Sequence, residues 1–282
     1  MISLTIRRKG MNFIMSVFSL IAVIVALIPL VLIFVHLVSK GIGAVNIDFF
    51  TQLPKPVGET GGGMVNALVG TSVMVLIACV IALPIGLLGG LYLSEFGNEK
   101  FGDIVRFAAD MLNGTPSIIM GVFTYAIIVV PLKNFSALAG GVALGIMMLP
   151  MVMRTTEEMV RLVPTTLREA SLALGVPYWK TLLRIILKTA QAGIITGVLL
   201  AIARVAGETA PLLFTALGNQ FWNLDIMEPI AALPLQIYTY AISPFEEWHR
   251  QAWAGALVLI GGVLLLSLGS RFVFRKKRGS AR

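Results

Sequence analysis

Residues 154–190 read RTTEEMVRLVPTTLREASLALGVPYWKTLLRIILKTA, and this stretch places six lysines and arginines between two long apolar runs. The whole chain is 57% hydrophobic and only 13% charged, with a mean hydropathy of +0.90. Soluble domains usually carry about 25% charged residues. We therefore expect an all-α, polytopic membrane protein in which residues 154–190 form a polar loop between helices that cross a lipid bilayer.

Six apolar runs are long enough to cross a bilayer, whose hydrocarbon core of about 30 Å needs about 20 helical residues. They are Phe13–Val38, Met64–Leu93, Ala109–Val130, Phe135–Met153, Ile185–Leu217 and Ala252–Phe274. Six transmembrane helices are therefore predicted. The further apolar stretch between Pro229 and Pro244 is short and is interrupted by Pro234. We expect it to be a re-entrant or interfacial segment.

The positions of lysine and arginine predict the orientation, because cytoplasmic segments carry an excess of both. With the N-terminus in the cytoplasm, cytoplasmic segments hold 17 of the 22 lysines and arginines and external segments hold 4, while Arg204 lies within a span. Both termini are therefore predicted to be cytoplasmic. The first run follows a basic segment, residues 7–9, and exceeds the core of a cleavable signal peptide, so we expect a retained anchor.

The composition argues against metal, cofactor and nucleic-acid sites. Cys79 is the one cysteine, His36 and His249 are far apart, and no H-E-x-x-H motif occurs. No metal and no other cofactor is therefore expected. The formal charge of +8 comes from basic residues at the ends of apolar runs. That placement is typical of membrane orientation and does not indicate nucleic-acid binding.

A short helix is predicted within the polar loop, at about residues 166–175. Thr166 and Glu169 have the T-x-x-E spacing of a capping box. Gly175 suits the end of a helix, and Pro177 prevents its continuation. One small and apolar stripe follows from the helical spacing of Leu167, Ala170, Ser171 and Leu174. Such a helix can dock in a groove of another protein or pack on its own bundle, and the residues alone leave both interpretations open.

The spacing of Glu169-Ala170-Ser171, Gly175, Ile185 and Leu187 resembles the EAA loop of ABC importer permeases, E-A-A, three residues, G, nine residues, I-x-L-P. The resemblance implies a type I ABC importer permease fold, in which this loop is a coupling helix seated in a cleft of an ATPase subunit. It therefore implies an ATPase-coupling role for Glu169, Ala170, Ser171 and Gly175. Two positions depart from the pattern: Ser171 replaces an alanine and Lys188 replaces the final proline, although that lysine also occurs in the A-type family named below.

No phosphate-binding loop of the form G-x-x-x-x-G-K-[ST] occurs in the sequence. The chain is therefore expected to be a permease subunit and not an enzyme, with ATP hydrolysed by a separate subunit.

The fifth apolar run contains two charged residues, Arg204 and Glu208, whose spacing of four predicts a shared helix face. Facing lipid, each would cost about 2.5–3.5 kcal/mol or more, so they are expected to face the bundle interior or a water-filled path. One interpretation is an intrahelical ion pair that fixes packing. The other is an anion station, in which Arg204 donates to phosphate oxygens and Glu208 accepts the proton of a hydrogen phosphate.

The segments AGETAPLLFTA (206–216), LNGTPSIIMGVFTYA (112–126) and ISPFEEWHRQAWAG (242–255) resemble the PstA-type family of phosphate permeases. The resemblance implies an importer of inorganic phosphate in the bacterial cytoplasmic (inner) membrane. It also implies a second related permease subunit, two ATPase subunits and an external phosphate-binding protein as partners. The expected substrate path comprises Arg204, Glu208, Thr209, Asn113, Thr115 and Ser117. Asn113, Thr115 and Ser117 can equally mark a helix start or a turn. Nearby, Asp110 has no evident partner in the sequence.

These observations predict three parts of the chain. Residues 1–63 form a first transmembrane helix with an external loop, residues 64–274 form the permease domain, and residues 275–282 form a basic cytoplasmic tail. The alternatives are a permease for another oxyanion, such as sulfate or molybdate, and a membrane scaffold that transports nothing.

Overall fold

A computed structural model describes residues 2–97 and 100–279, and its side chains are described from residue 7 to residue 269 outside the gap at 98–99. The predicted basic tail, residues 275–282, lies outside these described side chains. Within the described ranges the regular structure is helical, and one isolated bridge joins Leu217 to Ile230. The all-α prediction is confirmed.

Five helices are long and apolar enough to cross a membrane, or six if one bent pair counts as a single span. The long helices are α1 (Ile2–Gly41), α3 (Val65–Phe96), α7 (Ala137–Arg161), α10 (Leu187–Ala206) and α13 (Glu246–Gly279). The bent pair joins α4 (Lys100–Gly114) to α5 (Ser117–Thr124), which continues through a π-helical turn, η2 (Tyr125–Val129), into α6 (Val130–Leu132). The prediction of multiple membrane passes is therefore confirmed.

Two predicted spans differ from the structure. The third, Ala109–Val130, is not one helix, because the chain turns by 103° between α4 and α5 at Thr115 and Pro116. Proline at 116 lacks the N–H that a continuing helix needs and pushes Thr115 towards extended backbone. The fifth, Ile185–Leu217, ends at Ala206 and is followed by the separate short helix α11 (Ala210–Leu213).

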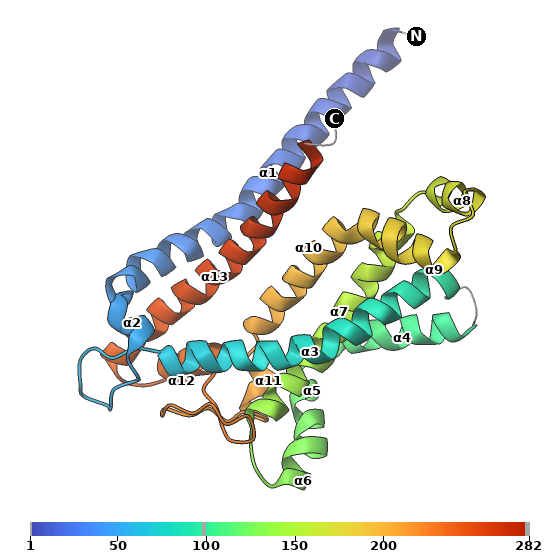
Figure 1. Ribbon diagram of the computed structural model, residues 1–282. Coiled ribbons are helices and arrows are strands. Elements are labelled where there is room, and N and C mark those ends of the chain that lie inside the picture. The colour runs from blue at the N-terminus through green and yellow to red at the C-terminus, as the bar shows by residue number, and fades with distance from the viewer. Residues whose placement is uncertain (1, 98–99, 280–282) are drawn as a thin grey trace.

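The centre of the bundle is the contact between α3 and α7 (Figure 1). Its buried core includes Met74, Ala78, Leu144 and Val152. Glycines on α3 bring the two backbones close, since a Cβ on Gly90 would stand 2.4 Å from the Met153 carbonyl oxygen. Close packing through small residues replaces the hydrophobic driving force that is absent between helices in lipid. The glycines of α3 therefore form a small-residue face that packs on α7.

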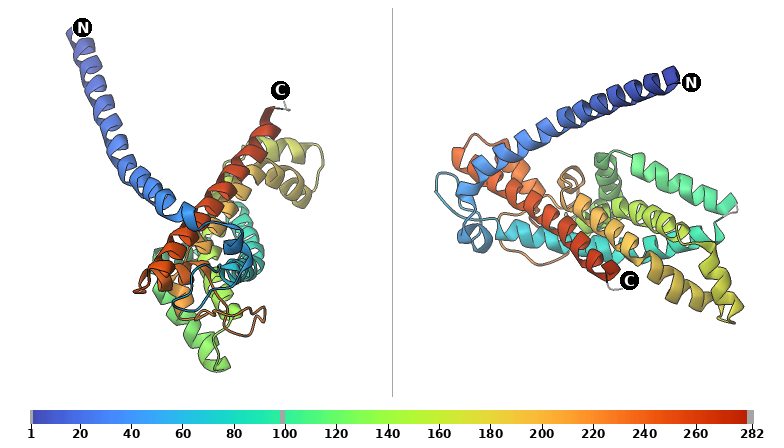
Figure 2. Two further views of the ribbon diagram at one scale, coloured as in Figure 1. Left: turned by 90° about the vertical axis from the view of Figure 1, so that its left-hand side faces the viewer. Right: turned by 90° about the horizontal axis from the view of Figure 1, so that it is seen from above.

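The two terminal helices lie at the side of this bundle, where α13 contacts α10 and α12 and α1 contacts α13. Figure 2 shows α1 and α13 meeting near one end of the molecule and diverging towards the chain termini. They meet where the Trp253 ring packs edge-on against His36, with ring centroids 5.1 Å apart. None of the most apolar window of α1 is buried by the rest of the chain. Its apolar surface must therefore face lipid or another protein.

The remaining short elements cap the two ends of the bundle. At one end lie α8 (Thr165–Ala173), α9 (Tyr178–Thr181) and the π-helical turn η3 (Leu182–Ile186) that leads into α10. At the other end lie the 3-10 turn η1 (Ile42–Ala44), α2 (Ile47–Thr51) and α12 (Leu233–Ala241). The nine residues of α12 extend about 14 Å, too short to cross a bilayer. This length agrees with the prediction that residues 229–244 do not span.

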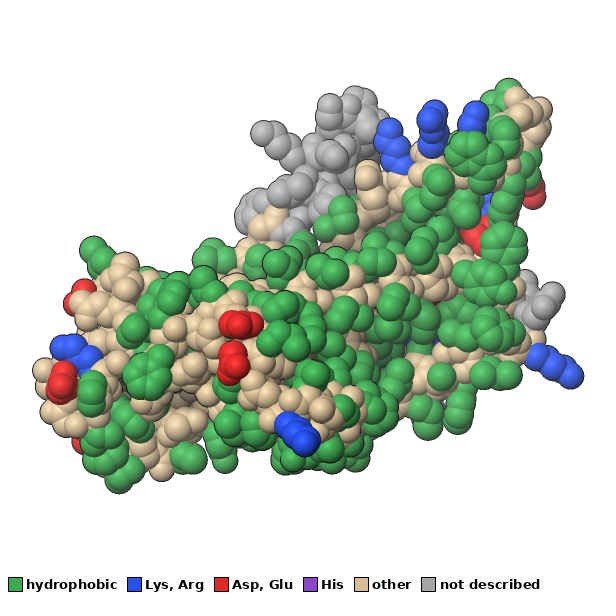
Figure 3. Space-filling view, turned by 60° about the horizontal axis from the view of Figure 1, so that its bottom comes forward, with side chains coloured by type: hydrophobic (Ala, Val, Ile, Leu, Met, Phe, Trp, Pro, Cys, Tyr) green, Lys and Arg blue, Asp and Glu red, His purple; other side chains and the backbone are tan. Residues whose placement is uncertain are grey.

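Much of the outer surface is apolar. Figure 3 shows one face that is largely hydrophobic, with a few charged side chains gathered in small groups. This distribution fits a protein whose solvent over most of its surface is lipid.

Candidate functional site

Arg204 lies in the last turn of α10, which ends at Ala206. The Gly207 N–H donates to the Arg204 carbonyl oxygen at 3.2 Å, and Gly207 is the C-cap residue. A cation is favoured at this position, because the last carbonyls of a helix leave a partial negative charge there. The Arg204 side chain is 53% exposed within this single chain. Its guanidinium is therefore available to a ligand or to a partner chain.

Glu208 lies beyond the end of α10, so the prediction that Arg204 and Glu208 share the face of one helix is wrong. The backbone leaves the helix at Gly207, and the next turn begins only at Ala210, with Pro211 in its first positions. The Arg204 Nε and Glu208 Oε1 atoms are 4.0 Å apart, which is too long for a hydrogen bond. Another contact of the guanidinium joins its Nη1 to the Met151 sulfur at 3.6 Å.

This geometry leaves most of the donors of Arg204 without a strong acceptor among the described residues. An ion pair at 4.0 Å between partly exposed groups stabilises packing only weakly. The Arg204 guanidinium can therefore donate hydrogen bonds to an oxyanion, with the Glu208 carboxylate beside it. Thr209 follows directly, and its carbonyl oxygen accepts from the Leu212 N–H at 3.1 Å to begin α11.

The predicted path residues Asn113, Thr115 and Ser117 lie at the bend between α4 and α5. The Thr115 hydroxyl donates to the Met111 carbonyl oxygen at 2.7 Å, so it helps to close the last turn of α4. All three side chains are partly exposed. No hydrogen bond joins any of them to Arg204 or Glu208 in the described part of the chain.

The packing of α5 nevertheless brings this bend towards the end of α10. A Cβ on Gly121 would stand 2.6 Å from the Pro211 Cα, so α5 and α11 lie in direct backbone contact. Ser117 is one helical turn before Gly121, and Glu208 is three residues before Pro211. The interrupted helix pair α4 and α5 thus contacts the chain just beyond the end of α10. In a bilayer, such irregular backbone is tolerated where it is buried in protein or lines a water-filled cavity.

The polar loop forms the projecting helix α8, Thr165–Ala173, close to the predicted range of 166–175. The predicted capping box is wrong, because Pro164 is the N-cap residue and Thr166 lies inside the helix without a side-chain cap bond. The C-terminal prediction is confirmed. Gly175 has a φ of +75°, and N–H groups of Gly175 and Val176 donate to the carbonyl oxygens of Leu172 and Ser171. This pair of bonds is a Schellman motif.

The predicted coupling residues have different surroundings. Glu169, Ala170 and Gly175 are exposed, and so is Leu174, at 84%. Ser171 is buried, and its hydroxyl forms a 2.8 Å hydrogen bond with the Thr181 hydroxyl. Ser171 therefore attaches the buried side of α8 to α9. This hydrogen bond gives a physical reason for a hydroxyl at the position where the family pattern has alanine. The exposed residues remain on the outer side of the helix.

A buried glutamate on α3 holds this loop in place. Glu95 is 4% exposed, and its carboxylate accepts from Arg168 at 2.7 Å and from the Tyr178 hydroxyl. Arg168 also donates to the Val163 carbonyl oxygen at 2.9 Å. The middle of the polar loop is therefore fixed to the end of α3, at α8 and at the start of α9.

Sequence reasoning missed a cluster of charges centred on Glu157 of α7. The Glu157 side chain is 1% exposed and accepts from Arg106 at 2.7 Å, from Arg154 at 2.9 Å and from Arg161 at 2.8 Å. Arg154 also contacts Asp110 at 3.2 Å, which supplies the partner that the sequence did not reveal. The i, i+3 and i+4 spacing of Arg154 and Arg161 around Glu157 was a usable signal, whereas Arg106 is remote in sequence.

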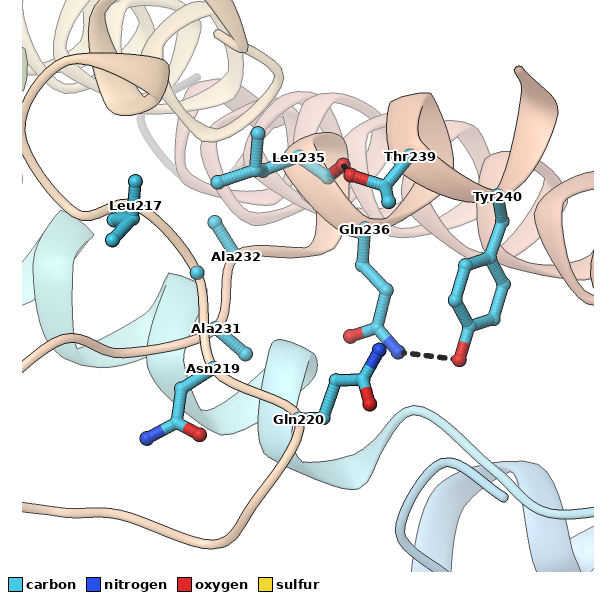
Figure 4. Close-up of a pocket in the computed structure, with 10 residues that line it drawn as sticks. Leu217, Asn219, Gln220, Ala231, Ala232, Leu235, Gln236, Thr239 and Tyr240 are labelled. Carbon is cyan, nitrogen blue, oxygen red and sulfur yellow. Dashed lines mark hydrogen bonds between the residues drawn. The ribbon is translucent and has the colours of Figure 1, made fainter. Parts of the chain in front are cut away.

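A pocket lies at the end of the bundle away from α8, between α12 and residues 217–232. Its volume is about 250 Å³. Figure 4 shows Gln220 and Gln236 pointing towards each other, with the Gln236 amide donating to the Tyr240 hydroxyl at 3.3 Å. Its ten lining residues are all described, and none carries a charge. The pocket lacks the cation that a phosphate site needs, so it is separate from the site at Arg204.

Comparison with known proteins identifies relatives along nearly the whole chain. Residues 82–279 match the family described as "Binding-protein-dependent transport system inner membrane component". The "Phosphate transport system permease protein PstA" of Yersinia pestis is 45% identical over 272 residues, which cover 96% of this chain and 92% of that protein. The protein of the same name from Haemophilus influenzae is 47% identical, with 96% of each chain covered.

A solved structure shares the fold at low sequence identity. The inward-facing MetNI methionine ABC transporter is similar to this chain with a TM-score of 0.58 and 22% identity, covering 75% of this chain and 92% of the solved one. The likeness confirms the predicted importer-permease fold.

Proposed function

The chain belongs to the family of binding-protein-dependent transport system inner membrane components, and from this premise we propose that it is the membrane-spanning permease subunit of an importer for inorganic phosphate. Relatives named as phosphate transport permeases are 45–47% identical over nearly full length. This likeness carries the choice of phosphate over sulfate or molybdate. A scaffold without transport is not favoured, because the relatives are named as permeases.

The proposed substrate station is Arg204, with Glu208 beside it and Thr209, Asn113, Thr115 and Ser117 along the path. The guanidinium offers a planar set of N–H donors that match the oxygens of a tetrahedral anion. Phosphate keeps a proton near neutral pH, and the Glu208 carboxylate can accept that proton in a hydrogen bond. Sulfate has no such proton, so its contact with the Glu208 carboxylate would be repulsive although Arg204 could still donate to it. The pair therefore supports discrimination between the two oxyanions.

The proposed assembly contains this chain, a second related permease, two ATPase subunits and an external phosphate-binding protein. Family membership supports the binding protein and the ATPase. The exposed outer side of α8, with Glu169, Ala170 and Leu174, supports a contact with the ATPase. The excess of lysine and arginine in the segments on one side supports a cytoplasmic position for both termini, and the same orientation would put α8 on the side of ATP.

Phosphate uptake by an Arg204→Gln variant tests this proposal. Radiolabelled phosphate and sulfate are offered separately to vesicles that contain the whole transporter. The wild-type chain is expected to support ATP-dependent uptake of phosphate only, and the variant is expected to lose at least 90% of it while assembling normally. Arg250→Gln is the matched control, because Arg250 is exposed and pairs only at the surface with Glu247. Normal phosphate uptake by Arg204→Gln would refute the station.

A further inference from the structure

A groove of about 620 Å³ opens between the last part of α3 and the start of α10. It lies at the end of the bundle that carries α8 (Figure 1). The lining includes Leu88 and Leu91 from α3 and Arg184, Lys188, Gln191 and Ile195 from η3 and α10. A water molecule occupies about 30 Å³ in the liquid, so the groove is far larger than a small inorganic ion requires.

The lining changes from charged to apolar along the groove. On the side of η3 and α10, the polar lining residues follow in the order Arg184, Lys188 and Gln191, with Leu183 and Leu187 beside the two cations, and beyond Gln191 the lining is apolar, at Ile194 and Ile195. The opposite side, on α3, is formed by leucines. A ligand that fits this gradient has an anionic head and an apolar body. A phosphate ion fits only the first part, and a neutral hydrophobic molecule fits only the second.

The two cations of the groove are free to bind such a head. Arg184 and Lys188 are exposed, and neither forms an ion pair or hydrogen bond with any residue that the structure describes. The other arginines of the same end are paired with acidic groups; they are Arg106, Arg154, Arg161 and Arg168. Arg184 and Lys188 therefore differ from these arginines in lacking a counter-ion.

The depth of the groove fits the boundary between headgroups and hydrocarbon. The candidate span Tyr178–Ala206 has 29 residues, which is about 44 Å of helix and exceeds the hydrocarbon core by about nine residues. Arg184 lies within that excess, and the long side chain of Lys188 can reach the same level. Ile195 and the leucines of α3 lie deeper.

The direction of the groove favours lipid over the second permease. Ile195 and Arg204 are nine residues apart, or about two and a half turns, which puts them on opposite sides of α10. The side that carries Arg204 is the proposed path and faces the second permease, so the groove faces away from both. This choice of occupant rests on the proposed function, through the assignment of the path to Arg204.

We propose that the groove is a binding site for one anionic phospholipid, with the headgroup phosphate on Arg184 and Lys188 and an acyl chain along Leu88 and Ile195. Basic pockets between membrane helices at the cytoplasmic side are suited to anionic headgroups. The site also gives a role to Lys188, the residue at which the loop departs from the proline of the EAA pattern.

Native mass spectrometry of the detergent-purified transporter tests the site. Phosphatidylglycerol and phosphatidylethanolamine with identical acyl chains are added at equal concentration. The wild-type complex is expected to retain one more phosphatidylglycerol per chain. In the double variant Arg184→Gln, Lys188→Gln the preference is expected to fall about 30-fold, since each basic residue near the surface contributes about fivefold. Lys180→Gln is the matched control, because Lys180 lies over the Trp179 ring outside the groove.

Two other measurements identify a different occupant. A photoreactive benzoylphenylalanine at position 88 is expected to yield an adduct of lipid mass, and a polypeptide adduct in its place would overturn the proposal. Displacement of phosphatidylglycerol by excess inorganic phosphate would assign the two cations to the transported ion and would also overturn it. An unchanged lipid preference in the double variant has the same consequence.

The lipid readout is separable from transport. Loss of lipid selectivity in the double variant together with normal uptake by Arg204→Gln would leave the lipid site standing and refute the path. The reverse pattern would refute the lipid site alone.

Discussion

Replacing Glu157 by alanine is expected to destabilise the chain by about 3 kcal/mol, because three arginines would lose a shared counter-ion. The Glu157 carboxylate is 1% exposed and accepts at 2.7–2.9 Å from Arg106, Arg154 and Arg161. Removing one partner of a buried ion pair costs about 3–5 kcal/mol. The three arginine side chains are 16%, 29% and 47% exposed, so water recovers part of their solvation. The lower end of the range is therefore the expected value.

Thermal unfolding of the purified transporter measures this effect. For a chain of this size each kcal/mol shifts the Tm by roughly 2–4 °C, so Glu157→Ala is expected to lower it by about 6–12 °C. Glu158→Ala is the matched control, since Glu158 is the next residue on α7, is exposed and has no ion pair among the described residues. Glu157→Gln keeps an acceptor oxygen and should fall between the two.

The reasoning fails if Glu157→Ala and Glu158→Ala unfold within about 2 °C of each other. In that case the arginines would be fully solvated or paired elsewhere in the assembled transporter, and the cluster would contribute no net stability.

Two further predictions concern packing and docking. Gly90→Ala is expected to lower the Tm by several degrees, because its Cβ would meet the Met153 carbonyl oxygen at 2.4 Å. Gly261→Ala is the control, since a Cβ there has nothing within 4 Å and should leave the Tm unchanged or raise it slightly. Equal Tm values for the two variants would contradict the close approach of α3 and α7. Leu174→Glu, at a side chain that is 84% exposed, should preserve folding but abolish co-purification with the ATPase and ATP-dependent uptake; intact co-purification would remove α8 from the contact.

Hydropathy predicted the long helices well because it depends on the local sum of apolar side chains. The ranges Met64–Leu93 and Phe135–Met153 lie inside or nearly inside α3 and α7. Hydropathy carries no information on backbone direction, so it joined α4 to α5 across Thr115 and Pro116 and carried the fifth span past Gly207. In both places the breaker residues were visible in the sequence. The predicted spans nevertheless run across them, whereas the chain uses them to stop one helix and begin another.

The candidate site was predictable only in part, for a related reason. Arg204 was found because a cation in an apolar run is costly to expose to lipid, so such a residue indicates a buried or functional position. The Glu157 cluster was not found, because its residues lie outside the apolar runs and Arg106 is 51 residues away along the chain. Local spacing reveals pairs on one helix, whereas a contact between α4 and α7 depends on how the helices pack.

The polar loop is attached to one end of α10, and Arg204 lies at the other end. This arrangement explains how the polar loop can act at a distance on the proposed substrate station. Ser171 joins α8 to Thr181, and from there the chain passes through η3 into α10, a continuous helix of 20 residues that ends at Ala206. Arg204 therefore lies at the far end of a rod of about 30 Å whose near end is attached to α8.

Glu95 and Glu157 hold the neighbouring segments to α3, α4 and α7. Because α10 is stiff and the backbone after Gly207 is broken, movement of α8 would change the position of Arg204 relative to Glu208 more than it would bend α10. The distance between Arg204 and Glu208, 4.0 Å in this structure, is then expected to change during the proposed transport cycle. ATP can change this distance only by favouring one conformation over another.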